Sequence, residues 1–152
     1  WSSDVCSSDL FIKLRLFDTK GKEVANTFYW RSNDKYEGRK TLTGPTSSGF
    51  EDLSKLKQVQ LKTRYKAYQE GDRHFIKAEI KNPSSTVAFF TQLQLLGQDK
   101  KPVRPSFYTD NFFSLLPGES KTVIIETAAS DMPSEPTFVV KGWNIKPSSF
   151  KL

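Results

Sequence analysis

Apolar and polar residues alternate along most of the second half of the chain. The alternation covers residues 59–67, 73–81 and 87–96, and in the first of these segments basic or amide side chains occupy the opposite positions. A period of two is typical of β-strands with one covered and one solvated face. The positions expected on the covered face are Val59, Leu61, Thr63, Tyr65, Ala67, His74, Ile76, Ala78, Ile80, Phe89, Thr91, Leu93 and Leu95.

The stretch 107–126 combines two strand patterns with a turn between them. Residues 111–116 predict a short strand that enters a tight corner, and residues 121–126 alternate β-branched and polar side chains. Pro117-Gly118 separates the two patterns, because proline presets φ and glycine accepts the positive φ of a type II turn. We therefore expect an obligatory corner at Gly118.

These strands, with one more at 137–142, are short and separated by turn residues. Six or seven of them at a spacing of about ten residues predict an antiparallel β-sandwich. A parallel sheet would need helical crossovers of about a dozen residues, which no loop between them can hold. We place this all-β domain at 57–145 and expect residues 146–152 to form a loosely held tail.

The first half of the chain is organised differently. Residues 11–32 predict a β-hairpin, which we interpret as the end of a preceding β-sandwich domain, since an isolated hairpin is marginal in water. Residues 33–56 are polar and rich in glycine, which predicts a linker. Within it, Phe50, Leu53 and Leu56 recur every third residue, as on one turn of helix.

Residues 1–10 match the rest of the chain in neither composition nor period. Their back-translation resembles the end of a sequencing-adapter primer, so we expect them to be an artefact and the natural chain to continue upstream of Phe11. The alternative is a disordered, serine-rich leader. By either interpretation the single cysteine, Cys6, says nothing about the redox compartment.

Composition and charge narrow the range of functions. The 152 residues are 36% hydrophobic, and the net charge of +6 comes from basic residues scattered among acids. Scattered charge predicts a solvated surface and no nucleic-acid partner. No apolar stretch reaches the ~20 residues that span a bilayer, so we expect no membrane partner. One histidine and no phosphate-binding glycine loop predict no metal and no cofactor.

Two motifs carry a family resemblance. The run Tyr108, Asp110, Asn111 and an aromatic pair, followed by Ser-Leu-Leu-Pro-Gly-Glu, resembles the C-terminal immunoglobulin-like domain of family 2 glycoside hydrolases. The exo-β-D-glucosaminidase and β-mannosidase branch is the most similar. Asn-x-Phe-Tyr-Trp at 26–30 resembles the closing strand of the immunoglobulin-like domain that precedes it in these enzymes.

The resemblance implies an immunoglobulin-like β-sandwich within a larger enzyme. The parent would use two glutamates on a (β/α)8 barrel to hydrolyse β-linked amino sugars or mannosides with retention of configuration. It also implies that the partners are the upstream domains of the same polypeptide, and a periplasmic or secreted location. Neither barrel glutamate is present in this chain, so substrate choice would lie outside it.

Acidic residues in the second half were considered as a catalytic pair, since glycoside hydrolysis needs two carboxyl groups beside the scissile bond. The candidates are Asp110, Glu119, Glu126 and Asp131. Because Glu119 and Asp131 fall in predicted turns and Glu126 on a strand face, we expect ordinary solvated roles. The sequence therefore predicts no catalytic residue.

Carbohydrate binding is the remaining hypothesis for this region. Tyr108, Asp110, Asn111 and Trp143 combine aromatic faces with polar acceptors, the residue types that hold sugar rings. Alternatively, Phe112 or Phe113 fills the core, Trp143 covers one end of it, and Asp110-Asn111 forms a turn that satisfies its own backbone. We predict a non-catalytic scaffold that also borders the active site of a family 2 enzyme. The alternatives are an autonomous carbohydrate-binding module and a cell-surface adhesion sandwich.

Overall fold

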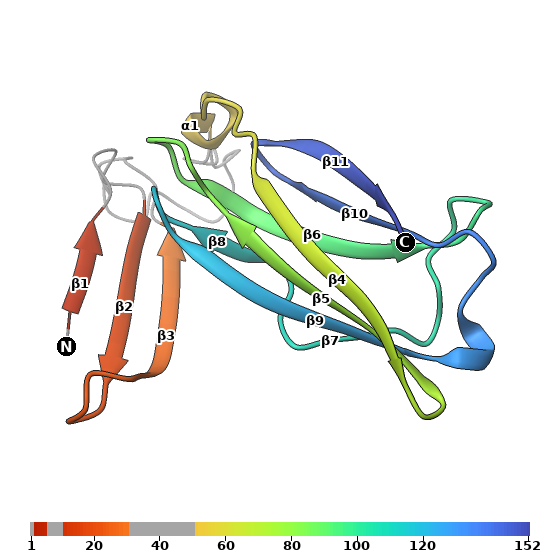
Figure 1. Ribbon diagram of the computed structural model, residues 1–152. Helices are drawn as coiled ribbons and strands as arrows, with labels where there is room; N and C mark the ends of the chain where they lie inside the picture. The colour runs from red at the N-terminus through yellow and green to blue at the C-terminus, as the bar shows by residue number, and fades with distance from the viewer. Residues whose placement is uncertain (1, 6–10, 31–50) are drawn as a thin grey trace, which may run out of the picture. The chain divides into compact units, whose positions relative to one another are not determined.

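The computed structural model describes residues 2–5, 11–30 and 51–152. The chain divides into two compact units, residues 1–56 and residues 57–152, which we describe separately. Figure 1 shows the elements of each unit. Among the described residues no helix has the length and apolar character needed to cross a membrane.

The first unit contains a three-stranded antiparallel sheet in the order β1-β2-β3, with β1 at Ser2–Val5, β2 at Phe11–Phe17 and β3 at Glu23–Trp30. The predicted hairpin is confirmed, because β2 and β3 pair from Phe11↔Trp30 onward. Asp18 closes its turn, since its Oδ1 accepts the backbone N–H groups of Lys20 and Lys22, both at 2.9 Å. The pairing of β1 with β2 does not test the artefact hypothesis for residues 1–10, which stays a prediction.

A short helix, α1 at Glu51–Ser54, lies at the end of the predicted linker. Leu53 is buried and Leu56 half-buried, as expected for one helical turn that turns a single side inward. The rest of the predicted linker, residues 33–50, lies outside the described residues.

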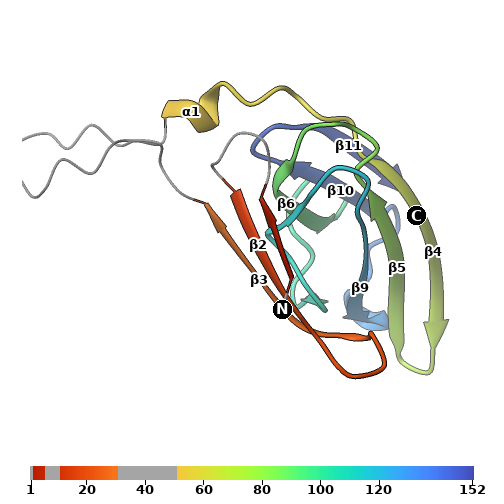
Figure 2. The ribbon, with the colours of Figure 1, turned by 90° about the vertical axis from the view of Figure 1, so that its left-hand side faces the viewer.

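The second unit is an antiparallel β-sandwich of two four-stranded sheets, as predicted. The front sheet has the order β4-β5-β9-β7 and the back sheet the order β11-β10-β6-β8. Figures 1 and 2 show the two sheets facing each other. The strands are β4 (Lys62–Glu70), β5 (Arg73–Lys81), β6 (Ala88–Leu96), β7 (Phe107–Tyr108), β8 (Phe113–Leu115), β9 (Ser120–Ala128), β10 (Thr137–Gly142) and β11 (Ile145–Lys151).

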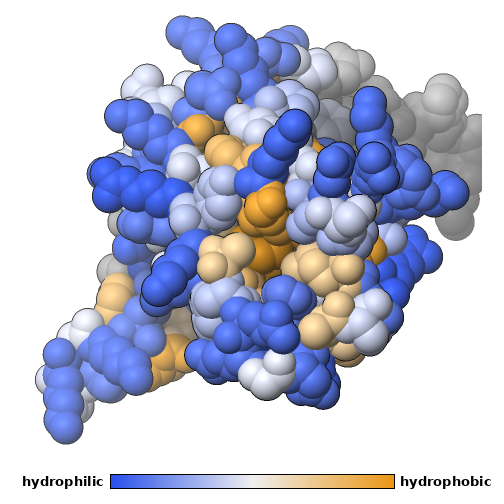
Figure 3. All heavy atoms as spheres, turned by 45° about the vertical axis from the view of Figure 1, so that its right-hand side comes forward, coloured by the Kyte–Doolittle hydropathy of each residue, from blue (hydrophilic) through white to orange (hydrophobic). Residues whose placement is uncertain are grey.

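The core lies between the two sheets and is built from the alternating positions. Both sheets contribute fully buried side chains, among them Ile76 and Ile125 from the front and Leu95 and Phe138 from the back. The inward faces predicted for 73–81 and 87–96 are therefore confirmed. Hydrophilic side chains cover most of the face seen in Figure 3, and apolar ones gather in one area of it.

The first predicted strand needs a correction. Val59 and Leu61 are buried as expected, but β4 begins only at Lys62, Tyr65 is 41% exposed and Ala67 is exposed. The reason is that β4 lies at the edge of its sheet, where the opposite sheet covers one face incompletely. Tyr65 still faces inward: its ring meets Phe138 edge-on, with centroids 5.0 Å apart.

The corner predicted at Gly118 is confirmed. Gly118 has φ +80°, and Pro117-Gly118 forms the turn between β8 and β9. Its N–H donates to the backbone carbonyl of Asn82 at 2.9 Å, so this corner is bonded to the end of β5. A side chain with a Cβ is strained at this φ.

The prediction of a loosely held tail at 146–152 was wrong. Residues 145–151 form β11, which pairs with β10 from Gly142↔Ile145 to Thr137↔Lys151. Val59 and Ile145 also form a bridge, which ties the beginning of the second unit to its end. The alternation in 145–151 is weak because Pro147, Ser148 and Ser149 interrupt it, so only the pairing with β10 reveals the strand.

Candidate functional site

Tyr108, the first predicted site residue, lies on β7 and is half-buried against the core. Its hydroxyl accepts the backbone N–H of Leu95 on β6 at 2.9 Å. Burial raises the pKa of Tyr108 above its ordinary value of 10.0, although the Leu95 N–H partly offsets this. The tyrosine therefore links the two sheets through a neutral hydroxyl.

Asn111 completes β6 with its side chain. Its Oδ1 accepts the N–H of Leu93 at 2.8 Å, and its Nδ2 donates to the carbonyl of Leu93 at 3.0 Å. This pair of bonds takes the place of a strand partner. Both polar atoms of the side chain are therefore engaged within the domain, with the backbone of a distant strand and not only with that of their own turn, which the turn hypothesis did not foresee.

Asp110 forms contacts within its own loop and with β9. Its Oδ1 accepts the N–H of Asn111 at 2.7 Å, and its carboxylate is ion-paired with Lys121. The Lys121 ammonium also lies over the ring of Phe113, 5.1 Å from the centroid. Asp110 therefore orients a lysine that covers a core aromatic ring.

Trp143 lies in the turn between β10 and β11 and is 60% exposed, so the expectation that it covers one end of the core was wrong. Asn144 takes the inward position instead and is only 4% exposed. Its Oδ1 accepts the N–H of Phe89 at 2.8 Å, and its Nδ2 donates to the carbonyls of Lys57 at 2.9 Å and Val87 at 2.8 Å. Adjacent residues of this turn point in opposite directions, so only one of the two can face the core, and that residue is Asn144.

Trp143 belongs to an exposed aromatic group, of which the sequence analysis missed Phe90. Phe90 and Phe112 are 40% and 50% exposed, and their ring centroids lie 5.5 Å apart. Both residues have positive φ, 58° and 57°, which is unusual for a bulky side chain. The N–H of Trp143 bonds to the carbonyl of Phe89, so Trp143 belongs to the same end of β6. We call Phe90, Phe112 and Trp143 the aromatic group.

The adjacent aromatic residues at 89–90 and 112–113 were the only signal in the sequence for the two phenylalanines of this group. One residue of each pair has to face outward, and the structure buries Phe89 and Phe113. Phe90 lies within an irregularity between Ala88 and Thr91, where the β6–β8 register shifts, and its positive φ accompanies this bulge. Such a bulge depends on the pairing of distant strands, so the sequence did not indicate it.

Two of the acidic residues considered as a catalytic pair, Glu119 and Glu126, make structural contacts. Glu126 forms an ion pair with Arg73 at 2.7 Å, and Glu119 Oε2 accepts the N–H of Leu116 at 2.8 Å. Asp131 ends an exposed 3-10 helix, Ala129–Asp131. In the described part of the chain, no three His, Cys, Asp or Glu side chains come together as a metal site would require.

A family model described as "Exo-beta-D-glucosaminidase Ig-fold domain" matches residues 41–145. The chain belongs to this family. Its sandwich is thus an immunoglobulin-like domain of the kind found in exo-β-D-glucosaminidases of glycoside hydrolase family 2. This match is consistent with a non-catalytic domain of a larger hydrolase.

Relatives of this exo-β-D-glucosaminidase Ig-fold domain are much longer proteins. The exo-β-D-glucosaminidase of Streptomyces avermitilis is 30% identical in an alignment of 148 positions that covers 91% of this chain and 16% of the relative. The enzyme of the same name from Amycolatopsis orientalis is 30% identical over 150 residues, or 14% of its length. The chain therefore spans about a sixth of these relatives.

Solved structures give the same result. The crystal structure of Amycolatopsis orientalis exo-chitosanase CsxA matches with a TM-score of 0.78 and 26% identity, covering 93% of this chain and 18% of the other. A complex of its E541A variant with PNP-β-D-glucosamine matches with a TM-score of 0.77. The likeness extends over nearly the whole chain.

Proposed function

We propose that this chain is a structural domain of a larger exo-β-D-glucosaminidase, where it packs against upstream domains and borders the active site without taking part in the chemistry. The observation that carries the proposal is the family match together with the small share of each relative that the chain spans. The whole enzyme would hydrolyse β-linked amino sugars on a barrel domain outside these residues.

The contacts of the predicted site residues support this role. Tyr108 and Asn111 bind backbone groups of β6, and Asp110 binds Lys121, so three of the four residues stabilise the sandwich itself. Substrate contact by Tyr108, Asp110, Asn111 and Trp143 stays a prediction. Of the four, Trp143 is the best placed to meet a sugar, because it is 60% exposed.

Hydrolysis by the purified 152-residue chain is the direct test. The substrate is p-nitrophenyl β-D-glucosaminide, and the A. orientalis relative is the positive control. We expect no release of p-nitrophenol by the chain. Release above the buffer rate would overturn the non-catalytic role, and upstream genomic sequence without a barrel domain bearing two strand-end glutamates would overturn the parent activity.

The aromatic group favours a second candidate function, an autonomous carbohydrate-binding module. Exposed aromatic rings stack on the apolar faces of sugars, and Phe90, Phe112 and Trp143 provide three of them. Affinity electrophoresis of the chain in gels with chitosan or mannan tests this role. Retardation that Trp143→Ala abolishes, while Tyr29→Ala in the first unit leaves it intact, would favour binding over scaffolding.

A further inference from the structure

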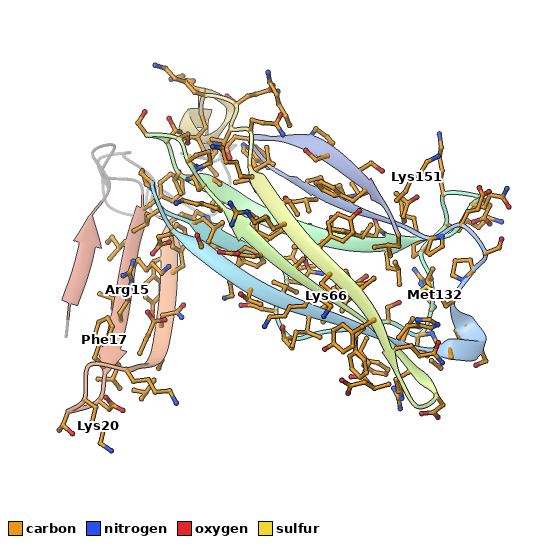
Figure 4. The ribbon with its side chains drawn as sticks, in the orientation of Figure 1. Arg15, Phe17, Lys20, Lys66, Met132 and Lys151 are labelled. Atoms are coloured by element: carbon orange, nitrogen blue, oxygen red, sulfur yellow. The ribbon has the colours of Figure 1, made fainter. Side chains whose placement is uncertain are left out.

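The outer face of the front sheet concentrates positive charge. The register of β4 and β5 sets Lys62 opposite Lys81, Arg64 opposite Glu79, and Lys66 opposite Lys77. Lys66 is labelled on β4 in Figure 4. We call Lys62, Arg64, Lys66, Lys77 and Lys81 the cationic face. The three pairs hold these five cations and one acid, Glu79, whereas the whole chain has 23 basic and 17 acidic residues.

Two of these cross-strand pairs join like charges, which destabilises a sheet. Among the residues that the structure describes, none of the five cations forms an ion pair. Arg73, farther along the same face of β5, is paired with Glu126 at 2.7 Å. The sheet thus compensates charge at one end and leaves it uncompensated at the other, an arrangement that stability alone does not favour.

A groove runs over this part of the face. Its volume is about 520 Å³. The groove is lined by Lys62, Arg64, Glu79, Lys81, Pro83, Gly118 and Ser120. Three cations, one carboxylate and one hydroxyl thus line a single concave surface. Such a surface offers ion pairing and hydrogen bonding to the same ligand.

Regular spacing suits a chain with repeated negative charges. Alternate residues on a strand lie roughly 6–7 Å apart, so Lys62, Arg64 and Lys66 form an extended row. Glu79 within the face can accept hydrogen bonds from hydroxyl groups but repels phosphate and carboxylate. The ligand that fits both features bears anionic groups separated by neutral hydroxyls, as an acidic polysaccharide does.

We propose that the cationic face binds an acidic polysaccharide through its carboxylate or sulfate groups. β-Linked glucosamine is a poor ligand for it, since its ammonium groups meet five cations. A nucleic acid would need aromatic side chains between the cations for base stacking. The aromatic residues nearest in register, Tyr68 and Phe75, stack on each other instead, with centroids 5.3 Å apart. The proposal is independent of the proposed scaffold role.

Binding of the 152-residue chain to polygalacturonate, heparin and poly-U RNA at physiological salt tests the proposal. The test variant is K62Q/K66Q/K77Q/K81Q, and the control is K20Q/K22Q/K100Q/K146Q, which removes four exposed lysines elsewhere. Each variant lowers the net charge from +6 to +2. We expect the test variant to bind an acidic polysaccharide at least about tenfold more weakly than the wild type, and the control within about twofold.

Two further measurements keep the test decisive. K66R/K77R should bind like the wild type, because it keeps the charge, and thermal unfolding should show that K62Q/K66Q/K77Q/K81Q is at least as stable as the wild type. Equal losses in the test and control variants would overturn the proposal, as would absence of binding to both polysaccharides. Preference for RNA over both polysaccharides would overturn it in favour of a nucleic-acid site.

Discussion

The two faces of the front sheet differ in how completely their side chains are packed against, or paired with, neighbouring side chains. On the inner face, Ile76, Ile80 and Ile125 are at most 1% exposed and pack into one core. On the outer face of the same strands, Lys66 and Lys77 stand opposite each other without an ion pair in the described structure. In β5, therefore, the even-numbered residues pack in the core and the odd-numbered residues face the solvent.

This difference shows which positions the fold constrains. Inner positions have neighbours on every side, so a change of one methyl group is felt. Outer positions have water as a neighbour, so the sheet tolerates changes there and even an unfavourable arrangement of charges. We expect substitutions on the inner face to cost stability and selected substitutions on the outer face to increase it.

The largest effect is expected for Ile125→Ala on the inner face. Loss of a fully buried isoleucine should lower the free energy of unfolding by about 2–5 kcal/mol. Ile124→Ala is the matched control, since Ile124 is the next residue on β9 and only half-buried. Urea denaturation of both variants measures the difference, and equal losses would contradict the assignment of the two faces.

Asn144→Ala tests whether a buried polar side chain contributes almost as much to the free energy of unfolding as a core side chain does. It leaves the Phe89 N–H and the Lys57 and Val87 carbonyls without their partner. An unsatisfied buried group costs about 1–3 kcal/mol. Asn26→Ala, an exposed control on β3, should change the unfolding free energy far less. A loss no greater than that of the control would show that Asn144 is dispensable.

Gly118→Ala tests the corner that joins β8 to β9. At φ +80° an alanine should cost about 1–2 kcal/mol. A Cβ added at Gly118 would meet open space, since no heavy atom outside its two chain neighbours lies within 4 Å of it, so the cost is backbone strain. Gly118→Asn should cost less, because asparagine tolerates this conformation. Thermal unfolding of the two variants measures the difference, and a larger loss for asparagine would contradict the explanation.

Tyr108, at the boundary between core and solvent, should make the free energy of unfolding depend on pH. Because burial raises its pKa, the folded state holds the phenolic proton more tightly than the unfolded state. Its stabilising contribution is therefore complete below pH 10 and is lost as the pH rises through the folded-state pKa. Above about pH 10 the unfolding free energy should fall more steeply for the wild type than for Tyr108→Phe. Denaturation of both proteins at several values from about pH 8 to 11 measures the two curves. Parallel curves would refute this.

The smallest effect is expected on the outer face and has the opposite sign. Lys77→Glu places an acid opposite Lys66 and should raise the unfolding free energy by about 0.2–1 kcal/mol. The matched control, Lys22→Glu in the hairpin turn, changes the net charge equally. Thermal unfolding at low and high salt separates the two, since the gain from a surface pair should shrink at high salt. A loss of stability would contradict the cost assigned to this pair of lysines.

Most residues of the candidate site could be named from the sequence, but few of their contacts and backbone angles could be predicted from it. Tyr108, Asp110 and Asn111 were recognised from their motif, and Trp143 from its residue type. The use of Asn111 as a partner for Leu93 follows from a contact between residues 18 positions apart. The positive φ of Phe90 arises from a bulge that its own neighbours in the chain do not specify.

Features that are local or repetitive could be predicted from the residues alone: the alternation that builds two sheets, the corner at Gly118 and the family motif. Tertiary structure decided the rest, because it depends on which distant strands become neighbours. Pairing with β10 turned the expected tail into β11, and the edge position of β4 left Tyr65 partly exposed. The register of β4 and β5 brought Lys66 and Lys77 together. Period and propensity act over a few residues, whereas these outcomes require the whole sheet.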